Sequence, residues 1–248
     1  MLFMFALFIS MGVMLCAWFV YLYTKNPGVV DVFWATAIFC VGLLYVNSVP
    51  VAPKLFMPQV LLFLWAMRLS LFLWVTRVAV GKVEMRYQKV RHYSKSKSLS
   101  FLYHFLFQAV LAWVIALPFY FMTQVVSFGL LQYVAALLVI MGIIGETVAD
   151  MTLYRFAKQQ TGQVCQVGLW CYSRHPNYFF VFLVWFGFSF MTAMSLQYLL
   201  SFLSIVTLFC IMWFITIPIT EQQSVERRGS QYKDYQKHVS CFFPGVKR

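Results

Sequence analysis

The chain alternates between long apolar runs and short polar connections. Each run is close to the roughly 20 residues that a helix needs to cross a bilayer. The pattern therefore predicts an all-α integral membrane protein, a bundle of about seven transmembrane helices that forms a single polytopic domain over residues 1–248. The predicted spans are 2–23, 29–49, 55–80, 101–123, 128–153, 177–195 and 197–218.

Composition supports a membrane location. Hydrophobic residues make up 62% of the chain and charged residues 10%, and the mean hydropathy is +0.77. A soluble domain would carry about 25% charged residues. The first apolar run lacks a basic segment before it and is longer than the apolar core of a signal peptide, so we interpret it as the first spanning helix.

Basic residues gather in three polar segments, and this bias predicts the orientation of the helices. The segments are 81–100, 154–176 and the region after 219, whereas the connections 124–127 and 195–197 carry no charge. Positively charged loops face the cytoplasm, which predicts an external N-terminus and a cytoplasmic C-terminus. Attraction to anionic membrane lipids accounts for most of the net charge of +12, so we expect no nucleic-acid partner.

The six cysteines show neither a disulfide framework nor a zinc pattern. No CxxC pair occurs. Cys171 and His175 have the spacing of one helical turn, but Pro176 follows at once and no other ligand pair is evident. We therefore expect no metal site.

The segment 168–178 is the densest polar cluster in the chain. Arg174 and His175 place side-chain donors just before an apolar run that begins near Asn177. A helix N-terminus carries unpaired N–H groups and a partial positive charge, so this arrangement suits a phosphate. A simpler interpretation is that Pro176 starts the helix and the aromatic residues lie at the membrane interface.

Several ionisable residues fall within or beside apolar runs, where burial is costly unless the group is paired or faces water. A structural ion pair, for example between Arg68 and Asp31, would explain one of them. Their shared depth favours a cavity that opens to the cytoplasm. The residues are Asp31, Arg68, Arg77, Glu146, Asp150 and Glu221.

Five segments resemble the bacterial branch of the steroid 5α-reductase-like membrane proteins, and the resemblance runs from about residue 29 to the end. The first helix and turn, 1–28, lie outside it. RHPNY at 174–178 also resembles the isoprenylcysteine carboxyl methyltransferases. The segments are VDVFW at 30–34, RLSLFLWVTR…GKVEMRYQ at 68–88, ETVADMTLYRF at 146–156, GLWCYSRHPNYF at 168–179 and ERRGSQYKDYQKHVSCFFP at 226–244.

The resemblance implies a bundle that binds NADPH on its cytoplasmic side and reduces a conjugated double bond in a steroid-like or isoprenoid-like, lipid-soluble substrate. The substrate would enter from the bilayer, here a bacterial inner membrane. Asp31 matches the catalytic carboxylate, and the basic tail 219–248 would close the cofactor site. The implied cofactor-binding residues are Arg68, Arg77, Asp150, Tyr172, Arg174, His175, Asn177, Tyr178, Glu221, Arg227, Tyr232 and Tyr235.

Two departures from the family pattern leave alternatives open. The family continues NYFGE, whereas this chain has Phe180 and Val181 after Phe179, and the third apolar run has no tyrosine to match the family's catalytic phenol. One alternative is a membrane methyltransferase in which Glu221 binds the amino group of S-adenosylmethionine. The other is a family member that keeps the fold without enzymatic activity.

Overall fold

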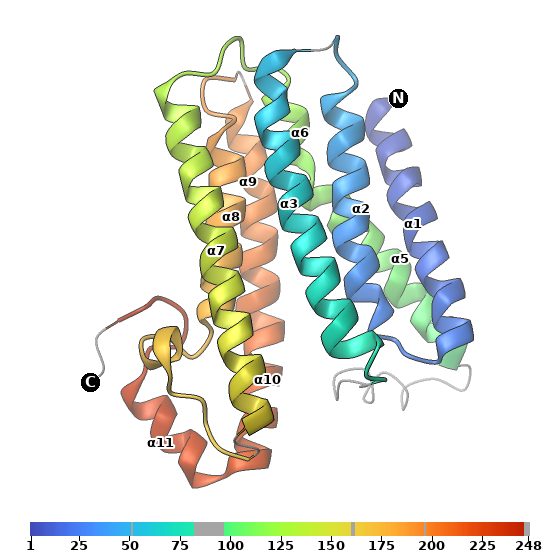
Figure 1. The fold of residues 1–248 in the computed structure, drawn as a ribbon. Helices are drawn as coiled ribbons and strands as arrows, with labels where there is room; N and C mark the ends of the chain where they lie inside the picture. The colour runs from blue at the N-terminus through green and yellow to red at the C-terminus, as the bar shows by residue number, and fades with distance from the viewer. Residues whose placement is uncertain (51, 82–96, 160–161, 196, 246–248) are drawn as a thin grey trace. The chain divides into compact units, whose positions relative to one another are not determined.

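The computed structural model describes residues 1–248 except 51, 82–96, 160–161, 196 and 246–248, and it is almost entirely helical (Figure 1). The described residues contain no β-strand, only an isolated bridge between Ser173 and Ser240. The predicted all-α fold is confirmed. Most of the predicted basic loop 81–100 lies outside the described residues.

The chain divides into two compact units. Unit 1 comprises Met1–Gln132 and Ser189–Thr207, and unit 2 comprises Tyr133–Phe188 and Leu208–Arg248.

Unit 1 is built around α2 (Val29–Val46), which packs against α1 (Leu2–Thr24), α3 (Phe56–Leu73), α5 (Lys97–Ile115) and α6 (Leu117–Met122). The short turn η1 (Pro53–Leu55) precedes α3 and the π-helical turn η2 (Trp74–Val78) follows it. Tyr21 packs on Phe101 and Phe105 with ring centroids 4.7 and 5.9 Å apart. Ser10 Oγ donates a hydrogen bond to the Ala109 carbonyl at 2.7 Å, so polar as well as apolar contacts join α1 to α5.

Unit 2 contains most of α7 (Leu130–Gln159) and α8 (Pro176–Phe190), followed by the end of α9 (Tyr198–Cys210), the π-helical turn η4 (Ile211–Thr216), α10 (Ile217–Arg228) and α11 (Ser230–His238). Pro218 lacks a backbone N–H, which accounts for the irregular hydrogen bonding just before it.

Two glycines allow α7 and α8 to approach closely. A Cβ atom on Gly142 would lie 2.9 Å from the Val184 backbone nitrogen, and one on Gly187 would lie 2.8 Å from the Ala135 carbonyl oxygen. Both contacts are with backbone atoms, which cannot move aside without shifting a helix. Small residues at such crossings let the helix backbones pack directly in membrane proteins.

Among the described residues, six helices are long and apolar enough to cross a membrane, and α8 is apolar but only 15 residues long. At 1.5 Å per residue it covers roughly 22 Å, less than the roughly 30 Å hydrocarbon core. The predicted span 177–195 therefore ends early. The reason lies just beyond α8, where Thr192 Oγ1 donates to the Ser189 carbonyl and Met194 adopts a positive φ of 77°.

Candidate functional site

The polar segment 168–175 is held in place by α7 and α11. It begins with a 3₁₀ turn, η3 (Gly168–Cys171), that Gly168 enters with a φ of 59°. The Trp170 indole nitrogen donates to the Ala149 carbonyl at 3.0 Å, and the Tyr235 hydroxyl donates to the Trp170 carbonyl at 2.5 Å. The segment is therefore a fixed part of unit 2.

The residues that follow α11 pair with this segment along the backbone. The Arg174 N–H donates to the Ser240 carbonyl at 2.9 Å, and the Gly245 N–H donates to the Tyr172 carbonyl at 3.0 Å. Ser173 Oγ donates to the Phe242 carbonyl at 2.8 Å. We call residues 239–245 the C-terminal strap.

Arg174 joins the polar segment to both α10 and α11. Its Nε and Nη2 donate to the two carboxylate oxygens of Glu221 at 2.6 and 3.2 Å. Its Nη1 donates to the carbonyls of Gln236 and Val239 at 2.9 and 2.7 Å. These contacts use four of the five N–H donors of a guanidinium. Burial alone would lower the pKa of Arg174, but the hydrogen bonds and charge of Glu221 raise it.

Glu221 is the centre of this cluster. His175 Nε2 lies 3.2 Å from Glu221 Oε1, and Gln236 Nε2 donates to Glu221 Oε2 at 2.8 Å. The His175 side chain is only 3% exposed, and its ring stacks on Tyr178 at 5.2 Å with an interplanar angle of 3°. A carboxylate has about four acceptor positions, so Arg174, His175 and Gln236 together satisfy Glu221.

Asp150 and Asn177 form a second polar contact in unit 2. Asn177 Nδ2 donates to Asp150 Oδ1 at 3.2 Å, and Asp150 is 8% exposed. Asn177 Oδ1 is buried and has no hydrogen-bond partner among the described residues. A buried acceptor without a donor is unfavourable, so this atom is a candidate contact for a ligand N–H.

The three predicted site residues of unit 1 lie on α2, α3 and η2. Arg77 Nη1 contacts Asp31 Oδ2 at 2.5 Å, and Asn26 Nδ2 donates to the Arg77 carbonyl at 3.3 Å. The guanidinium of Arg68 lies 5.5 Å from the centre of the Phe72 ring. Asp31 thus forms an ion pair with Arg77, and the predicted pair between Asp31 and Arg68 stays a prediction.

The remaining predicted residues of unit 2 differ in exposure. Tyr172 and Arg227 are exposed, whereas Tyr232 and Tyr235 are buried. Burial raises the pKa of Tyr232 to about 12, and burial also raises the pKa of Tyr235. The Tyr235 ring packs against Tyr232 and its hydroxyl holds the polar segment. Tyr235 therefore has a structural role, and its predicted contact with the cofactor stays a prediction.

The sequence alone did not identify Ser173 or Gln236 as part of the polar contacts around Arg174 and Glu221. Ser173 lies within the polar segment, so its position in the sequence could have marked it as a candidate site residue. Gln236 is one of several polar residues on a short helix, and nothing in the sequence distinguishes it from its neighbours. Both residues fix the orientation of groups that were predicted.

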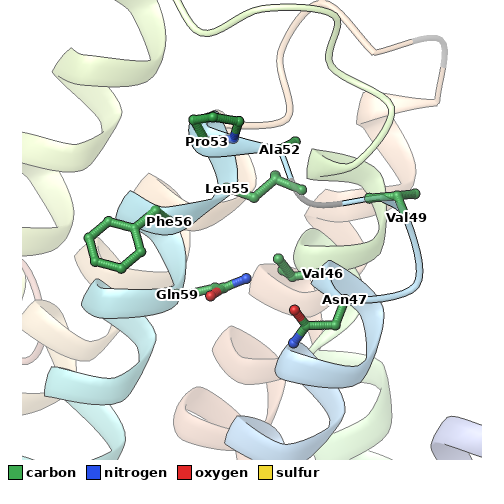
Figure 2. A pocket seen from close by; sticks show the side chains of 8 residues that line it. All are labelled: Val46, Asn47, Val49, Ala52, Pro53, Leu55, Phe56 and Gln59. Atoms are coloured by element: carbon green, nitrogen blue, oxygen red, sulfur yellow. The ribbon is translucent and has the colours of Figure 1, made fainter.

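Two pockets of about 410 Å³ each lie in unit 1, and neither is lined by a predicted site residue. In the first, Asn47 and Gln59 supply the polar side chains between α2 and α3 (Figure 2). The cofactor cavity expected on the cytoplasmic side stays a prediction. The first pocket is lined by Val46, Asn47, Val49, Ala52, Pro53, Leu55, Phe56 and Gln59, and the second by Phe190, Ala193, Met194, Ser195 and Tyr198.

In the described part of the chain, the all-α fold and the length and apolar character of its helices indicate an integral membrane protein. Residues 17–239 match a family model described as a protein of unknown function, DUF1295, and the chain belongs to this family. Searches of curated proteins and of solved structures return no significant match.

Proposed function

We propose that the protein is an NADPH-dependent reductase of a conjugated double bond in a lipid-soluble, steroid-like or isoprenoid-like substrate. The observation that carries the proposal is the buried acceptor Asn177 Oδ1 beside Asp150. Both residues fall in segments that resemble the steroid 5α-reductase-like proteins. Amide and amino groups of a nicotinamide adenine dinucleotide are N–H donors of the kind that this acceptor lacks.

The cations of unit 2 also fit a dinucleotide phosphate. Arg155, Lys158, Arg227 and Lys233 are exposed and come from α7, α10 and α11. Exposed cations can reach phosphate oxygens without breaking an existing buried pair. Arg174, by contrast, has four donors engaged within the protein. We therefore assign phosphate binding to these four exposed cations, of which Arg227 belongs to the predicted cofactor-binding residues. We assign a positioning role to Arg174.

When bound, NADPH would supply a hydride to the substrate. The protein's part is to orient the cofactor, exclude water and deliver a proton to the reduced product. Asp31 is the proposed proton donor. Its contact with Arg77 at 2.5 Å fixes the orientation of the carboxylate and favours the ionised form, so Asp31 would take up a proton from solvent before it passes one to the product.

Direct binding of NADPH to the purified full-length protein tests the proposal. Asn177→Ala should weaken binding by about 5- to 150-fold, because losing one hydrogen bond in a buried site costs about 1–3 kcal/mol and about 1.4 kcal/mol is tenfold. Asn47→Ala is the matched control, since Asn47 lines the first pocket of unit 1 and bonds within α2. Its affinity for NADPH should equal that of the wild type.

S-adenosylmethionine is measured in parallel by the same method and by thermal stability. A ligand that binds the native state raises the melting temperature. Saturable binding of S-adenosylmethionine without binding of NADPH would replace the reductase with a methyltransferase. If neither cofactor binds, the alternative of a family member without enzymatic activity takes precedence over both. With NADPH bound, Asp31→Asn should slow reduction of an enone without changing NADPH affinity.

A further inference from the structure

Three metal-ligand side chains from distant parts of the sequence meet next to Arg174. His175 precedes α8, Glu221 lies on α10 and Cys241 lies in the C-terminal strap. Their ligand atoms all lie within 4.8 Å of one another. We propose that His175, Glu221 and Cys241 bind a divalent metal ion of the zinc class. The proposal goes beyond the reductase activity and does not depend on it.

One separation matches that of a tetrahedral zinc site, and the ligand atoms of all three residues lie within 4.8 Å of one another. Zinc bonds of about 2.0–2.3 Å place neighbouring ligand atoms roughly 3.3–3.8 Å apart. His175 Nε2 and Glu221 Oε1 are already 3.2 Å apart. An imidazole, a carboxylate and a thiolate form a mixed nitrogen, oxygen and sulfur set that suits zinc rather than magnesium or calcium. The fourth position would be open to water.

The environment differs from that of acidic groups that come together by chance on a surface. The side chains of His175 and Glu221 are 3% and 16% exposed, and Cys241 is partly buried. Burial limits the access of water that would compete for the metal ion, and it restricts the movement of the three ligand side chains. A metal ion would add a bond to each of three chain segments that are already in contact.

Each ligand is oriented by a second layer of contacts, as is usual in metal sites. Arg174 and Gln236 fix the Glu221 carboxylate. The His175 ring is stacked on Tyr178. The backbone around Cys241 is tied to the polar segment, because the Arg174 N–H donates to the Ser240 carbonyl. The three ligands are thus held in place before any ion arrives.

The ion would replace one existing interaction, the contact between His175 and Glu221. His175 would carry its proton on Nδ1 so that Nε2 can bind the metal, and the Cys241 thiol would release its proton to solvent. Arg174 keeps its two hydrogen bonds to the Glu221 carboxylate, and its positive charge offsets part of the negative charge of the carboxylate and thiolate. One proton is released for each metal ion bound, and no oxidation or reduction takes place.

Cobalt titration of the full-length protein tests the site, because Co²⁺ replaces Zn²⁺ and reports its ligands by absorption. The wild type should show a thiolate-to-cobalt charge-transfer band in the near ultraviolet that saturates at one equivalent and is abolished by Zn²⁺. Cys241→Ser should lose this band. The matched control is Cys171→Ser, since Cys171 is also partly buried but bonds to the Gln166 carbonyl.

Thermal stability provides the second measurement. Zn²⁺ should raise the melting temperature of the wild type and of Cys171→Ser, because an ion that binds only the folded protein stabilises it. It should not raise that of Cys241→Ser, which is expected to fold because serine is nearly isosteric with cysteine. The proposal is overturned if the wild type shows no charge-transfer band, or if the band persists in Cys241→Ser. Binding of NADPH is measured separately, so failure of one proposal does not decide the other.

Discussion

Replacing Arg174 with lysine should weaken the attachment of α10, α11 and the C-terminal strap to the polar segment. Lysine keeps the positive charge but cannot reproduce the planar fork of a guanidinium. Its single ammonium group can stay near Glu221, but the bonds to the Gln236 and Val239 carbonyls are lost. Arg174 is only 11% exposed, so water does not replace these bonds in the folded protein.

The size of the effect follows from the two lost bonds. A hydrogen bond that involves a charged group contributes about 1.5–3 kcal/mol. Two such bonds at the lower value give about 3 kcal/mol. For a protein of 150–250 residues, 1 kcal/mol corresponds to about 2–4 °C in melting temperature. Arg174→Lys should therefore melt about 6–12 °C below the wild type.

Tryptophan fluorescence during heating measures the melting temperature, and limited trypsin digestion reports whether α11 has come loose. The matched control is Lys237→Gln, which removes an ion pair with Asp234 on the surface of α11. The two side chains of that pair are 70% and 63% exposed, and exposed pairs contribute little. An Arg174→Lys protein that melts and resists trypsin like the wild type would refute the reasoning, as would equal losses in the two variants.

Three further predictions concern packing, pH and a buried hydroxyl. Gly142→Ala should lower the free energy of unfolding by up to about 2 kcal/mol, because the overpacking cost of about 1–3 kcal/mol outweighs the gain of about 1 kcal/mol in helix propensity. Gly12→Ala, with no atom within 4 Å of the new Cβ, should not lower it, and equal losses in thermal denaturation would contradict the packing argument. Burial raises the pKa of Tyr232 to about 12, so the folded protein holds more protons than the unfolded chain above pH 10, near the ordinary tyrosine pKa. The free energy of unfolding should therefore fall as the pH rises from about 10 to about 12, and Tyr232→Phe should reduce the slope of melting temperature against pH. Tyr235→Phe removes the donor to the Trp170 carbonyl and should cost about 1–3 kcal/mol in denaturant unfolding; an unchanged midpoint would contradict this.

The helical segments were predictable because a single physical requirement governs them. A segment that crosses a bilayer must be apolar and must satisfy its own backbone, and only a helix does both. The ends of the segments were less predictable. α7 continues to Gln159, beyond the predicted end at 153, because a helix can project into water after its apolar part ends. Hydropathy marks the edge of the apolar region and not the edge of the helix.

The candidate site was predictable in its residue types but not in its pairings. The sequence identified Arg174, His175 and Glu221 as polar groups beside apolar runs. It did not show that Glu221 would bind Arg174 or that Cys241 would approach both, because Arg174 lies 47 positions before Glu221 and Cys241 follows on a separate segment beyond α11. Proximity between distant segments depends on helix packing, which local patterns do not encode. The internal contacts of Arg174 support the positioning role that we propose for it, and its predicted contact with the cofactor stays a prediction.

The buried hydroxyls at the end of α8 bear on how this part of the chain enters the membrane. Ser189 Oγ lies 3.1 Å from Ser204 Oγ, and Thr192 Oγ1 lies 2.7 Å from Ser201 Oγ. Thr192, Ser201 and Ser204 also donate to carbonyls of their own segments, so the contacts between the two segments add to bonds that each can form alone. The pairing therefore favours the two segments lying side by side. A helix as short as α8 gains its place in the bilayer from its neighbour as much as from its own apolar surface.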